Sequence, residues 1–264
     1  GKIDAPSVLV THESISRLPL VPMLTLFYEF GFLSDSVRDR FDGFSSRLPL
    51  VGGVSHILPY QGVDPDLEDR LEEMDLEVDL DKEKISVVCP GFIVDRKNYH
   101  LAAEYFSEVL EEHPDAELVF AGGSHRNEDS DAIGKVRKSI HNKGIEENAR
   151  ITGVLNSEMH VYEYIRKADV VVLPYEDINQ SGILARSLAL GKPTVVSDVE
   201  GLADAVRKYG GSIFSNPEDL GETVIEEIRS PSEIDREQVL EDMSWERNID
   251  EYEEMFSKIT EQSS

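Results

Sequence analysis

The sequence has few cysteines that could form covalent cross-links and no long apolar run that could span a membrane. Cys89 is the single cysteine among 264 residues, which excludes a disulfide framework and a thiolate metal site. It ends an apolar run that begins at Ile85, where we expect a buried packing residue rather than a nucleophile. No run approaches the roughly 18 apolar residues of a membrane span. The start at Gly1 lacks a basic and then apolar segment, which predicts no signal peptide and a cytoplasmic protein.

Basic residues are scarce. Only 26 Lys and Arg stand against 53 Asp and Glu, and the formal net charge is −27. Such a negative field makes nucleic acid and anionic membrane surfaces poor partners, so we expect no nucleic-acid ligand. The acidic residues are interleaved with apolar ones instead of forming a tail, which argues against disorder. We expect an acidic proteome and a salt-loving (halophilic) host, because high salt screens the self-repulsion of the chain.

Composition divides the chain into four segments. They are a partial acceptor-side lobe at 1–64, an acidic linker at 65–84, a Rossmann-like domain at 85–230, and a C-terminal closing helix and tail at 231–264. The first segment holds strand-like runs at Ser7–Thr11 and Val54–Pro59, with a short helical pattern near Ser34–Phe41 between them. The acidic segment has few apolar residues and would also suit a solvated helix. Near-helical spacing of apolar residues predicts a helix over Asp235–Gln262.

The third segment alternates strands and helices. Strands are predicted at Ile85–Cys89, Glu117–Ala121, Ala149–Thr152, Val170–Leu173, Thr194–Ser197 and Gly211–Phe214. Helices are predicted at Tyr99–His113, Asp131–Lys143, Met159–Lys167, Gly182–Leu190 and Gly201–Tyr209. This alternation is typical of a doubly wound parallel sheet with right-handed crossovers. Ligands of such sheets bind beyond the carboxyl ends of the strands, so the loops that follow strands hold the candidate residues.

Two of these loops carry candidate ligand groups near the start of the domain. Arg96 and Lys97 precede a helix, and together they could hold a diphosphate by a planar fork and a point charge. The same pair would also suit a solvated turn in which Asp95 balances the charge. Gly122 and Gly123 follow the second strand and would let backbone approach a ligand closely. A plain turn between a strand and a helix would look the same.

The loop that follows the fourth strand opens through Ser181 and Gly182 into a helix. The unpaired N–H groups and dipole of a helix start form an anion site. The loop at Ser197–Gly201 closes the same edge of the sheet. The dinucleotide fingerprint GxGxxG is absent, which counts against a nicotinamide-dependent dehydrogenase. No pair of acidic residues stands at a strand end in the pattern of a metal site.

Several segments resemble, in order, the group 1 (family 4) retaining glycosyltransferases. The most specific is GILARSLALGKPTVVSD at Gly182–Asp198, and GFIVDRKN at Gly91–Asn98 is similar to that family's glycine-to-lysine loop. The other matching segments are VLVTHES, HILPYQGVD, LVFAGGS, ARITGVL, ADVVVLPY and SWERNIDEY. The resemblance implies an α/β fold of the GT-B type. This fold would comprise a doubly wound parallel-sheet donor domain and an incomplete or small N-terminal Rossmann-like lobe.

The resemblance implies transfer of a sugar, of the hexosyl type, from a nucleotide-diphosphate donor to an acceptor hydroxyl with retention, in glycan or glycolipid biosynthesis. It gives catalytic positions to Arg96 and Lys97, which would hold the diphosphate, and to His12, which would lie near the transferred sugar. The implied donor-binding residues are Gly91, Gly122, Gly123, Thr152, Val154, Leu155, Glu176, Gln180, Ser181, Gly182, Ile183 and Leu184. We expect no metal and no cofactor besides the nucleotide sugar. The acceptor would be a glycan or a lipid-linked molecule. The resemblance would also fit a peripheral contact at the inner membrane face or a contact with a partner subunit.

The sequence departs from the family's pattern at several positions. Arg186 stands where the second of two paired glutamates normally meets the donor ribose, Phe92 replaces an arginine and Asn98 replaces a glycine. With its Ser181-Gly182 pair, the chain resembles a branch of the family that has Ser-Gly at this loop. Residues 1–64 are fewer than the roughly 150 of a full acceptor lobe. We therefore expect a fragment of a longer protein, a gene that lacks its start, or a lobe completed by a partner.

Two alternative functions stay open at this point. One is a non-catalytic or partner-dependent module that binds a nucleotide sugar. The other is a sugar-nucleotide epimerase of the GT-B fold.

Overall fold

The structure is a computed structural model that describes residues 8–11, 29–32, 54–57, 62–124, 130–178 and 180–262. The chain divides into two compact units. The first consists of residues 1–62 and 241–264, and the second of residues 63–240. The acidic segment 65–84 therefore clusters with the second unit, and the C-terminal segment is divided between the two.

The first unit contains a small parallel sheet in the order β1-β2-β3. Its strands are β1 (Val8–Thr11), β2 (Glu29–Phe32) and β3 (Val54–Ile57). Strands β1 and β3 lie within the predicted runs, whereas β2 was not predicted. The helical pattern near 34–41 and His12 lie outside the described residues. Helix α11 (Trp245–Gln262) belongs to this unit, and the Trp245 ring lies so close to Gly62 that a Cβ at Gly62 would clash with it.

The second unit is built on a six-stranded sheet in the order β6-β5-β4-β7-β8-β9, and all its strands are parallel. The strands are β4 (Ser86–Pro90), β5 (Glu117–Ala121), β6 (Ala149–Ile151), β7 (Val170–Leu173), β8 (Thr194–Ser197) and β9 (Ser212–Phe214). Every residue of β4, β5, β7 and β8 is buried, as expected for apolar strands covered on both faces. The predicted α/β fold with a doubly wound parallel sheet is confirmed.

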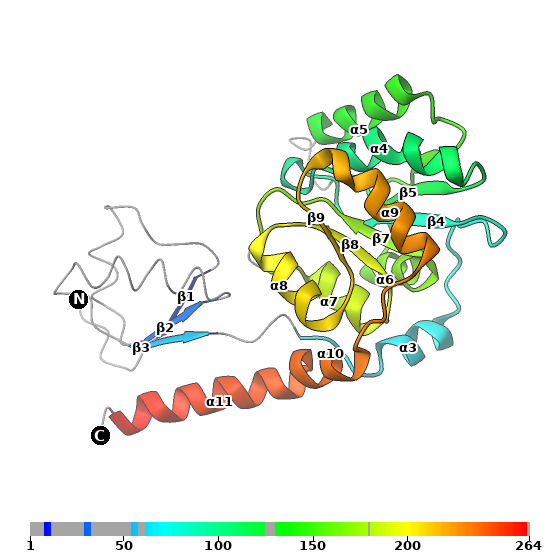
Figure 1. Ribbon diagram of the computed structural model, residues 1–264. Coiled ribbons are helices and arrows are strands. Elements are labelled where there is room, and N and C mark those ends of the chain that lie inside the picture. Colours follow the sequence, from blue (N-terminus) through cyan, green and yellow to red (C-terminus); the bar gives the residue numbers. More distant parts are fainter. Residues whose placement is uncertain are drawn as a thin grey trace, which may run out of the picture. The chain divides into compact units, whose positions relative to one another are not determined.

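Helices cover both faces of this sheet (Figure 1). The described helices between β3 and α11 are α3 (Leu67–Met74), η2 (Asp95–Lys97), α4 (Tyr99–Glu112), α5 (Ser130–Lys143), α6 (Glu158–Lys167), α7 (Gly182–Ala189), α8 (Glu200–Tyr209), η4 (Pro217–Asp219), α9 (Leu220–Arg229) and α10 (Arg236–Met243). Helix α4 packs against α5 and α9, while α6 packs against α7 and α3. Helix α9 was not predicted, and the single C-terminal helix expected over 235–262 is broken between α10 and α11. Among the described helices, none is both long and apolar enough to cross a membrane.

The strand order defines a switch point between β4 and β7. From β4 the chain moves outward to β5 and β6, and then returns to β7 on the other side of β4. The loops after β4 and β7 therefore diverge onto opposite faces, which opens a crevice where ligands of doubly wound sheets bind. These are the loops that contain Arg96, Lys97, Ser181 and Gly182.

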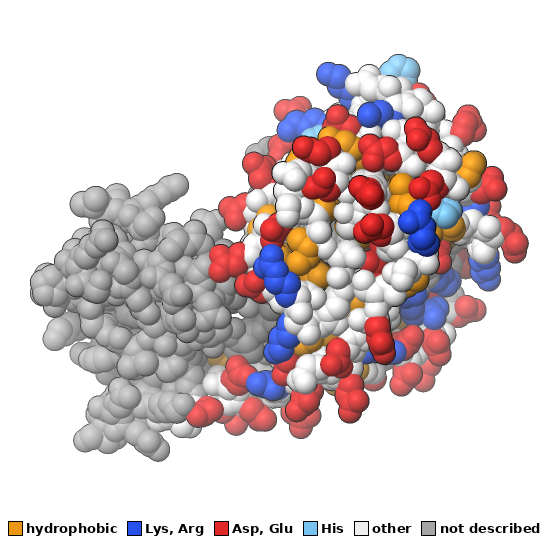
Figure 2. All heavy atoms as spheres, viewed as in Figure 1, with side chains coloured by type: hydrophobic (Ala, Val, Ile, Leu, Met, Phe, Trp, Pro, Cys, Tyr) orange, Lys and Arg blue, Asp and Glu red, His pale blue; other side chains and the backbone are white. Residues whose placement is uncertain are grey.

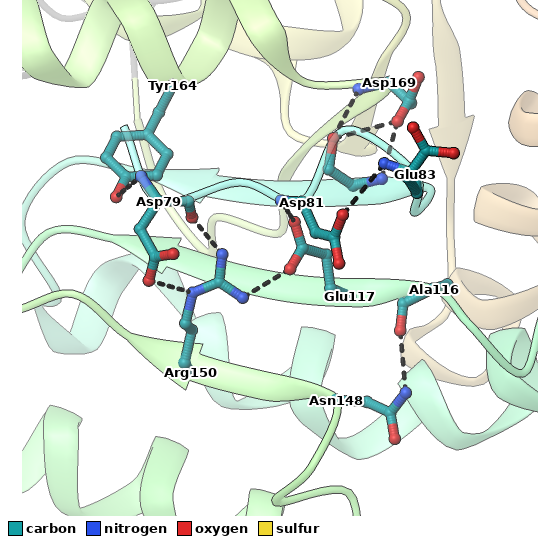
Figure 3. Close-up of polar contacts among 10 residues, drawn as sticks. Asp79, Asp81, Glu83, Ala116, Glu117, Asn148, Arg150, Tyr164 and Asp169 are labelled. Carbon is teal, nitrogen blue, oxygen red and sulfur yellow. Dashed lines mark hydrogen bonds and ion pairs between the residues drawn. The ribbon is translucent and has the colours of Figure 1, made fainter. Parts of the chain in front are cut away.

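Residues 75–84 are fixed to the opposite, amino end of the strands (Figure 3). The Arg150 guanidinium donates to the Glu117 carboxylate at 2.6 Å and to the carbonyl of Asp79. The Glu117 carboxylate also accepts from the backbone N–H of Asp81 at 3.0 Å. The backbone N–H of Asp79 donates to the Tyr164 hydroxyl at 3.1 Å. Although its composition suggested a linker, this acidic segment is tied to the domain core by side chains of β5, β6 and α6.

Charge is spread widely over the surface. Figure 2 shows Asp and Glu side chains scattered across the visible face of the described part, with Lys and Arg between them. Many basic side chains form ion pairs, for example Arg229 with Glu112 at 2.7 Å and Arg207 with Asp198 at 2.7 Å. Exposed pairs of this kind contribute little to stability individually. The excess of acidic residues is therefore left for solvent ions to screen.

Candidate functional site

The loop after β4 places a glycine and a lysine together at the switch point. Gly91 has φ +91°, a conformation that L side chains rarely adopt. A Cβ built on Gly91 would lie 3.0 Å from the Lys97 Nζ atom, so glycine is needed here for both backbone and space. Asn98 caps the C-terminal end of η2; it has φ +47° and donates its N–H to the Asp95 carbonyl. Asparagine tolerates this left-handed conformation, so Asn98 supplies the geometry of the glycine usual in the family.

The Lys97 ammonium lies in a mostly apolar surrounding. Its Nζ atom is 5.4 Å from the ring centroid of Tyr99 and 5.3 Å from that of Tyr175. It also donates to the Pro90 carbonyl at 3.5 Å. Burial, with repulsion from Arg96 adding to it, lowers the pKa of Lys97 to about 7. An anion that arrives beside Lys97 would favour its charged form.

Arg96 is exposed beside Lys97, and its guanidinium makes no hydrogen bond or ion pair with the residues that the structure describes. Asp95, which could have balanced the charge of this turn, instead pairs with Lys135 of α5 at 2.6 Å. The backbone carbonyl of Arg96 accepts from the N–H of Glu176 at 2.8 Å, which joins the loops after β4 and β7. Arg96 and Lys97 are thus two adjacent cations without a carboxylate partner in the described part of the chain.

The loop after β7 brings the start of α7 to the same point. Ser181 is the N-cap residue of α7, and its Oγ accepts from the N–H of Leu184 at 3.2 Å. The other N–H groups of a first helical turn have no partner within the helix and attract anions. A Cβ built on Gly91 would lie 3.6 Å from the Ile183 Cδ1 atom and 3.0 Å from the Lys97 Nζ atom. The lysine ammonium and the helix start therefore converge around Gly91.

The paired glycines after β5 have a packing role. A Cβ on Gly122 would collide with the Gly91 carbonyl, and a Cβ on Gly123 would lie 2.7 Å from the backbone nitrogen of Val154. Gly123 also accepts a backbone hydrogen bond from Ile93 at 3.0 Å. These contacts let the loops after β4, β5 and β6 approach one another closely, in the manner expected of glycine. The structure accounts for both glycines without a ligand.

Residues 152–155, implied to border the base, form the loop after β6 on the β5 side of the switch point. The Thr152 hydroxyl donates to the Phe120 carbonyl at 3.3 Å, and the Val154 side chain is exposed. Leu155 is half-buried. Val154 and the half-exposed Phe92 thus provide apolar side chains on the two loops beside Gly123.

Arg186, which the resemblance places where the family has a ribose-contacting glutamate, folds back along its own helix. Its guanidinium donates to the Gly182 carbonyl at 3.1 Å and lies 5.5 Å from the centroid of the Tyr162 ring on α6. The side chain thereby links α7 to α6. Glu176 is exposed and Gln180 is half-buried at the edge of the same loop. His12 lies outside the described residues, so its role stays a prediction.

Sequence reasoning missed Tyr99 and Tyr175, which are almost completely buried beneath Lys97. Tyr175 ends an apolar run and Tyr99 begins the apolar face of α4, and at both places an aromatic residue is ordinarily part of the core. Cys89, predicted as a packing residue, is confirmed as fully buried, and burial raises the pKa of its thiol well above the usual range. Within the described part of the chain, no three His, Cys, Asp or Glu side chains are grouped so that they could hold a metal ion.

The fold and this site define a class of protein. A doubly wound parallel sheet, with cations and a helix start at its switch point, is a nucleotide- or phosphate-binding α/β domain. Residues 84–230 match the model of the family described as "Glycosyl transferases group 1". The chain belongs to this family.

Solved structures with the same fold are distant in sequence. The Anabaena protein HepE in complex with UDP is similar with a TM-score of 0.77 and 13% identity, over 96% of this chain and 72% of that one. An α,α-trehalose 6-phosphate synthase from Burkholderia multivorans is similar with a TM-score of 0.78 and 13% identity, over 98% of this chain and 66% of that one. A sucrose-phosphate synthase from Thermosynechococcus elongatus is similar with a TM-score of 0.74 and 15% identity, over 97% of this chain and 68% of that one. These likenesses show the GT-B fold. No curated protein matches the sequence.

Proposed function

We propose that this chain transfers a hexosyl group from a nucleotide-diphosphate donor to an acceptor hydroxyl, with retention, in glycan or glycolipid assembly. The observation that carries the proposal is the convergence of Lys97 and the first turn of α7 around Gly91, at the switch point of the sheet. HepE, a neighbour of the same fold, was solved with UDP and glucose, which supports a nucleoside diphosphate sugar as donor.

The chemical task at this site is to stabilise a leaving group. When the bond between the sugar and the diphosphate breaks, negative charge grows on the leaving oxygen. Lys97 and Arg96 would neutralise this charge, and N–H groups at the start of α7 would bind phosphate oxygens. The low polarity around Lys97 strengthens its interaction with an anion, because tyrosine rings replace water on one side of the ammonium.

The remaining assignments follow from position around this point. Residues 152–155 would border the base, with Val154 as an apolar contact. The backbone at 180–184 would hold the phosphates and the sugar, and His12 would approach the transferred sugar. Arg186 is engaged with Gly182 and Tyr162, so we propose that the ribose is held by other groups than the family's glutamate.

Lys97→Ala tests the proposal directly. A panel of nucleotide sugars is first screened by calorimetry, and the donor that binds is then followed for transfer or for slow hydrolysis, which needs no acceptor. We expect Lys97→Ala to reduce turnover by about 10²-fold or more, because it removes charge stabilisation from the leaving group. Lys143→Ala is the matched control, since Lys143 is exposed at the C-terminal end of α5, away from the switch point.

Three outcomes would separate the candidate functions. Turnover by Lys97→Ala at the wild-type rate would contradict the proposed role of the lysine. Tight donor binding without transfer or hydrolysis would favour the nucleotide-sugar-binding module. Conversion of the donor to a second nucleotide sugar, without any acceptor, would favour the epimerase.

A further inference from the structure

The surroundings of Lys97 contain an aromatic corner. Its ammonium lies 5.4 Å from the ring centroid of Tyr99 and 5.3 Å from that of Tyr175. The two ring centroids are 6.0 Å apart, and the ring planes meet at 62°. Two steeply inclined rings thus approach one cation, and each ring face carries a negative quadrupole that attracts it.

Both rings are held in place by contacts of their own. Tyr99 and Tyr175 are only 1% and 2% exposed. The Tyr99 hydroxyl donates to the Pro90 carbonyl at 2.5 Å and lies 3.3 Å from the Tyr175 hydroxyl. The Ser197 hydroxyl donates to the backbone carbonyl of Tyr175 at 2.5 Å. Because neither ring is free to turn away, their faces define a fixed position for the ammonium.

Within the described part of the chain, no carboxylate holds the Lys97 ammonium in its position. Lys97 makes no ion pair there, whereas Lys135 and Lys167, which are more exposed, are paired with Asp95 and Glu163. A carboxylate beside Lys97 would neutralise its charge and compete with an incoming phosphate. Aromatic faces attract the cation without cancelling its charge, and so leave that charge available to a ligand.

We propose that Tyr99 and Tyr175 are positioning residues that hold the Lys97 ammonium toward the donor diphosphate, an inference that rests on the proposed function. The rings would act only through Lys97. Neither tyrosine needs to touch the donor. Both hydroxyls point into buried hydrogen bonds, so the ring faces, rather than the hydroxyl groups, are the parts that matter for binding.

A double-mutant cycle on donor binding tests this inference. Tyr175→Leu removes the ring and Tyr175→Phe keeps it, and each is made alone and together with Lys97→Met. The probe is UDP-glucose, or the member of the nucleotide-sugar panel that binds best, and the Kd is measured by calorimetry. We expect Tyr175→Phe to stay within about 2-fold of wild type and Tyr175→Leu to weaken binding about 5- to 10-fold. In the Lys97→Met background, Tyr175→Leu should have no further effect beyond about 2-fold.

Two results would overturn the inference. One is an equal loss from Tyr175→Leu in both backgrounds, which would mean a structural effect that does not pass through Lys97. The other is a loss in Tyr175→Phe as large as that in Tyr175→Leu. Tyr164→Leu is the control, because Tyr164 is similarly buried on α6 outside this cluster and its loss should leave the Kd unchanged. Tyr175→Met, which fills more of the volume, replaces Tyr175→Leu if the latter does not fold.

Failure of the proposed function would be visible separately. If no nucleotide sugar binds, or if Lys97→Met binds as tightly as wild type, the assignment of the donor site is wrong. The aromatic corner is then tested by the melting temperatures of wild type, Tyr175→Leu, Lys97→Met and the double variant of these two. The fall in melting temperature caused by Tyr175→Leu should be smaller when Lys97 is already Met, and equal falls in both backgrounds would refute the cation contact.

Discussion

Donor binding should depend on pH through Lys97. In the free protein, burial and the nearby Arg96 hold the pKa of this lysine at about 7. A bound diphosphate replaces solvent on the open side of the ammonium and favours its charged form. The pKa should therefore rise on binding, and the complex should take up a proton near neutral pH. By linkage, affinity then falls as the pH rises through 7.

The size of the effect follows from this pKa. If the bound lysine stays charged, affinity is proportional to the charged fraction of the free lysine, which falls from about 0.9 at pH 6 to about 0.1 at pH 8. The donor should therefore bind about 10-fold more weakly at pH 8 than at pH 6. At pH 7 the free lysine is about half protonated, so binding should take up about 0.5 proton.

Isothermal titration calorimetry in two buffers of different ionisation enthalpy measures both quantities. A nucleotide sugar is the right ligand, because the terminal phosphate of a free nucleoside diphosphate titrates near pH 6 itself. Lys97→Arg carries a cation that does not titrate and should bind without this pH dependence. The reasoning would be refuted if wild type took up no proton at pH 7, or if its pH dependence persisted unchanged in Lys97→Arg.

Four further predictions follow from particular contacts. Lys97→Met should raise the melting temperature most below pH 7, and this gain should shrink toward pH 10. The reason is that the pKa of Lys97 is about 7 in the folded protein and 10.5 ordinarily, so the wild type becomes more stable as the pH rises between these two values. Gly91→Ala should weaken donor binding about 10-fold and lower the unfolding free energy by about 1–3 kcal/mol, since φ is +91° and the new Cβ would press on Lys97; calorimetry and urea unfolding measure the two, and wild-type affinity would count against this geometry. Glu117→Ala should cost about 1–3 kcal/mol in urea unfolding, because Arg150 keeps only its exposed partner Asp79 and the backbone N–H of Asp81 loses its acceptor, while donor affinity should be unchanged; a loss under 1 kcal/mol would show that the contact is dispensable. The melting temperature should rise from low to molar potassium chloride, since salt screens the net charge of −27, and a flat or falling curve would contradict the salt-loving hypothesis.

Much of the second unit could be predicted because its strands are continuous apolar runs. The predicted bounds at 117–121, 170–173 and 194–197 agree with β5, β7 and β8 to the residue. The rule that ligands bind beyond the carboxyl ends of strands then selected the loops containing Lys97 and Ser181. Strand β2 was missed because Glu29-Phe30-Gly31-Phe32 is only four residues long and its two Phe alternate with Glu and Gly, which are depleted in strands.

Features that depend on distant side chains were beyond prediction from one sequence. Arg150 and Glu117 are 33 positions apart, so nothing local indicates that they fix the acidic segment to the sheet. Arg186 is turned onto Tyr162 by the packing of α7 on α6, which spacing along α7 alone does not reveal. Tyr175 likewise became a candidate only when the fold placed its ring beside Lys97.

A crystal structure of this chain with a bound nucleotide sugar tests the central claim most directly. The account predicts that the diphosphate lies at the switch point, with a phosphate oxygen within hydrogen-bonding distance of the Lys97 ammonium and another at the N–H groups that begin α7. A diphosphate bound elsewhere on the chain, or a bound donor with Lys97 still directed only at the Pro90 carbonyl, would contradict it.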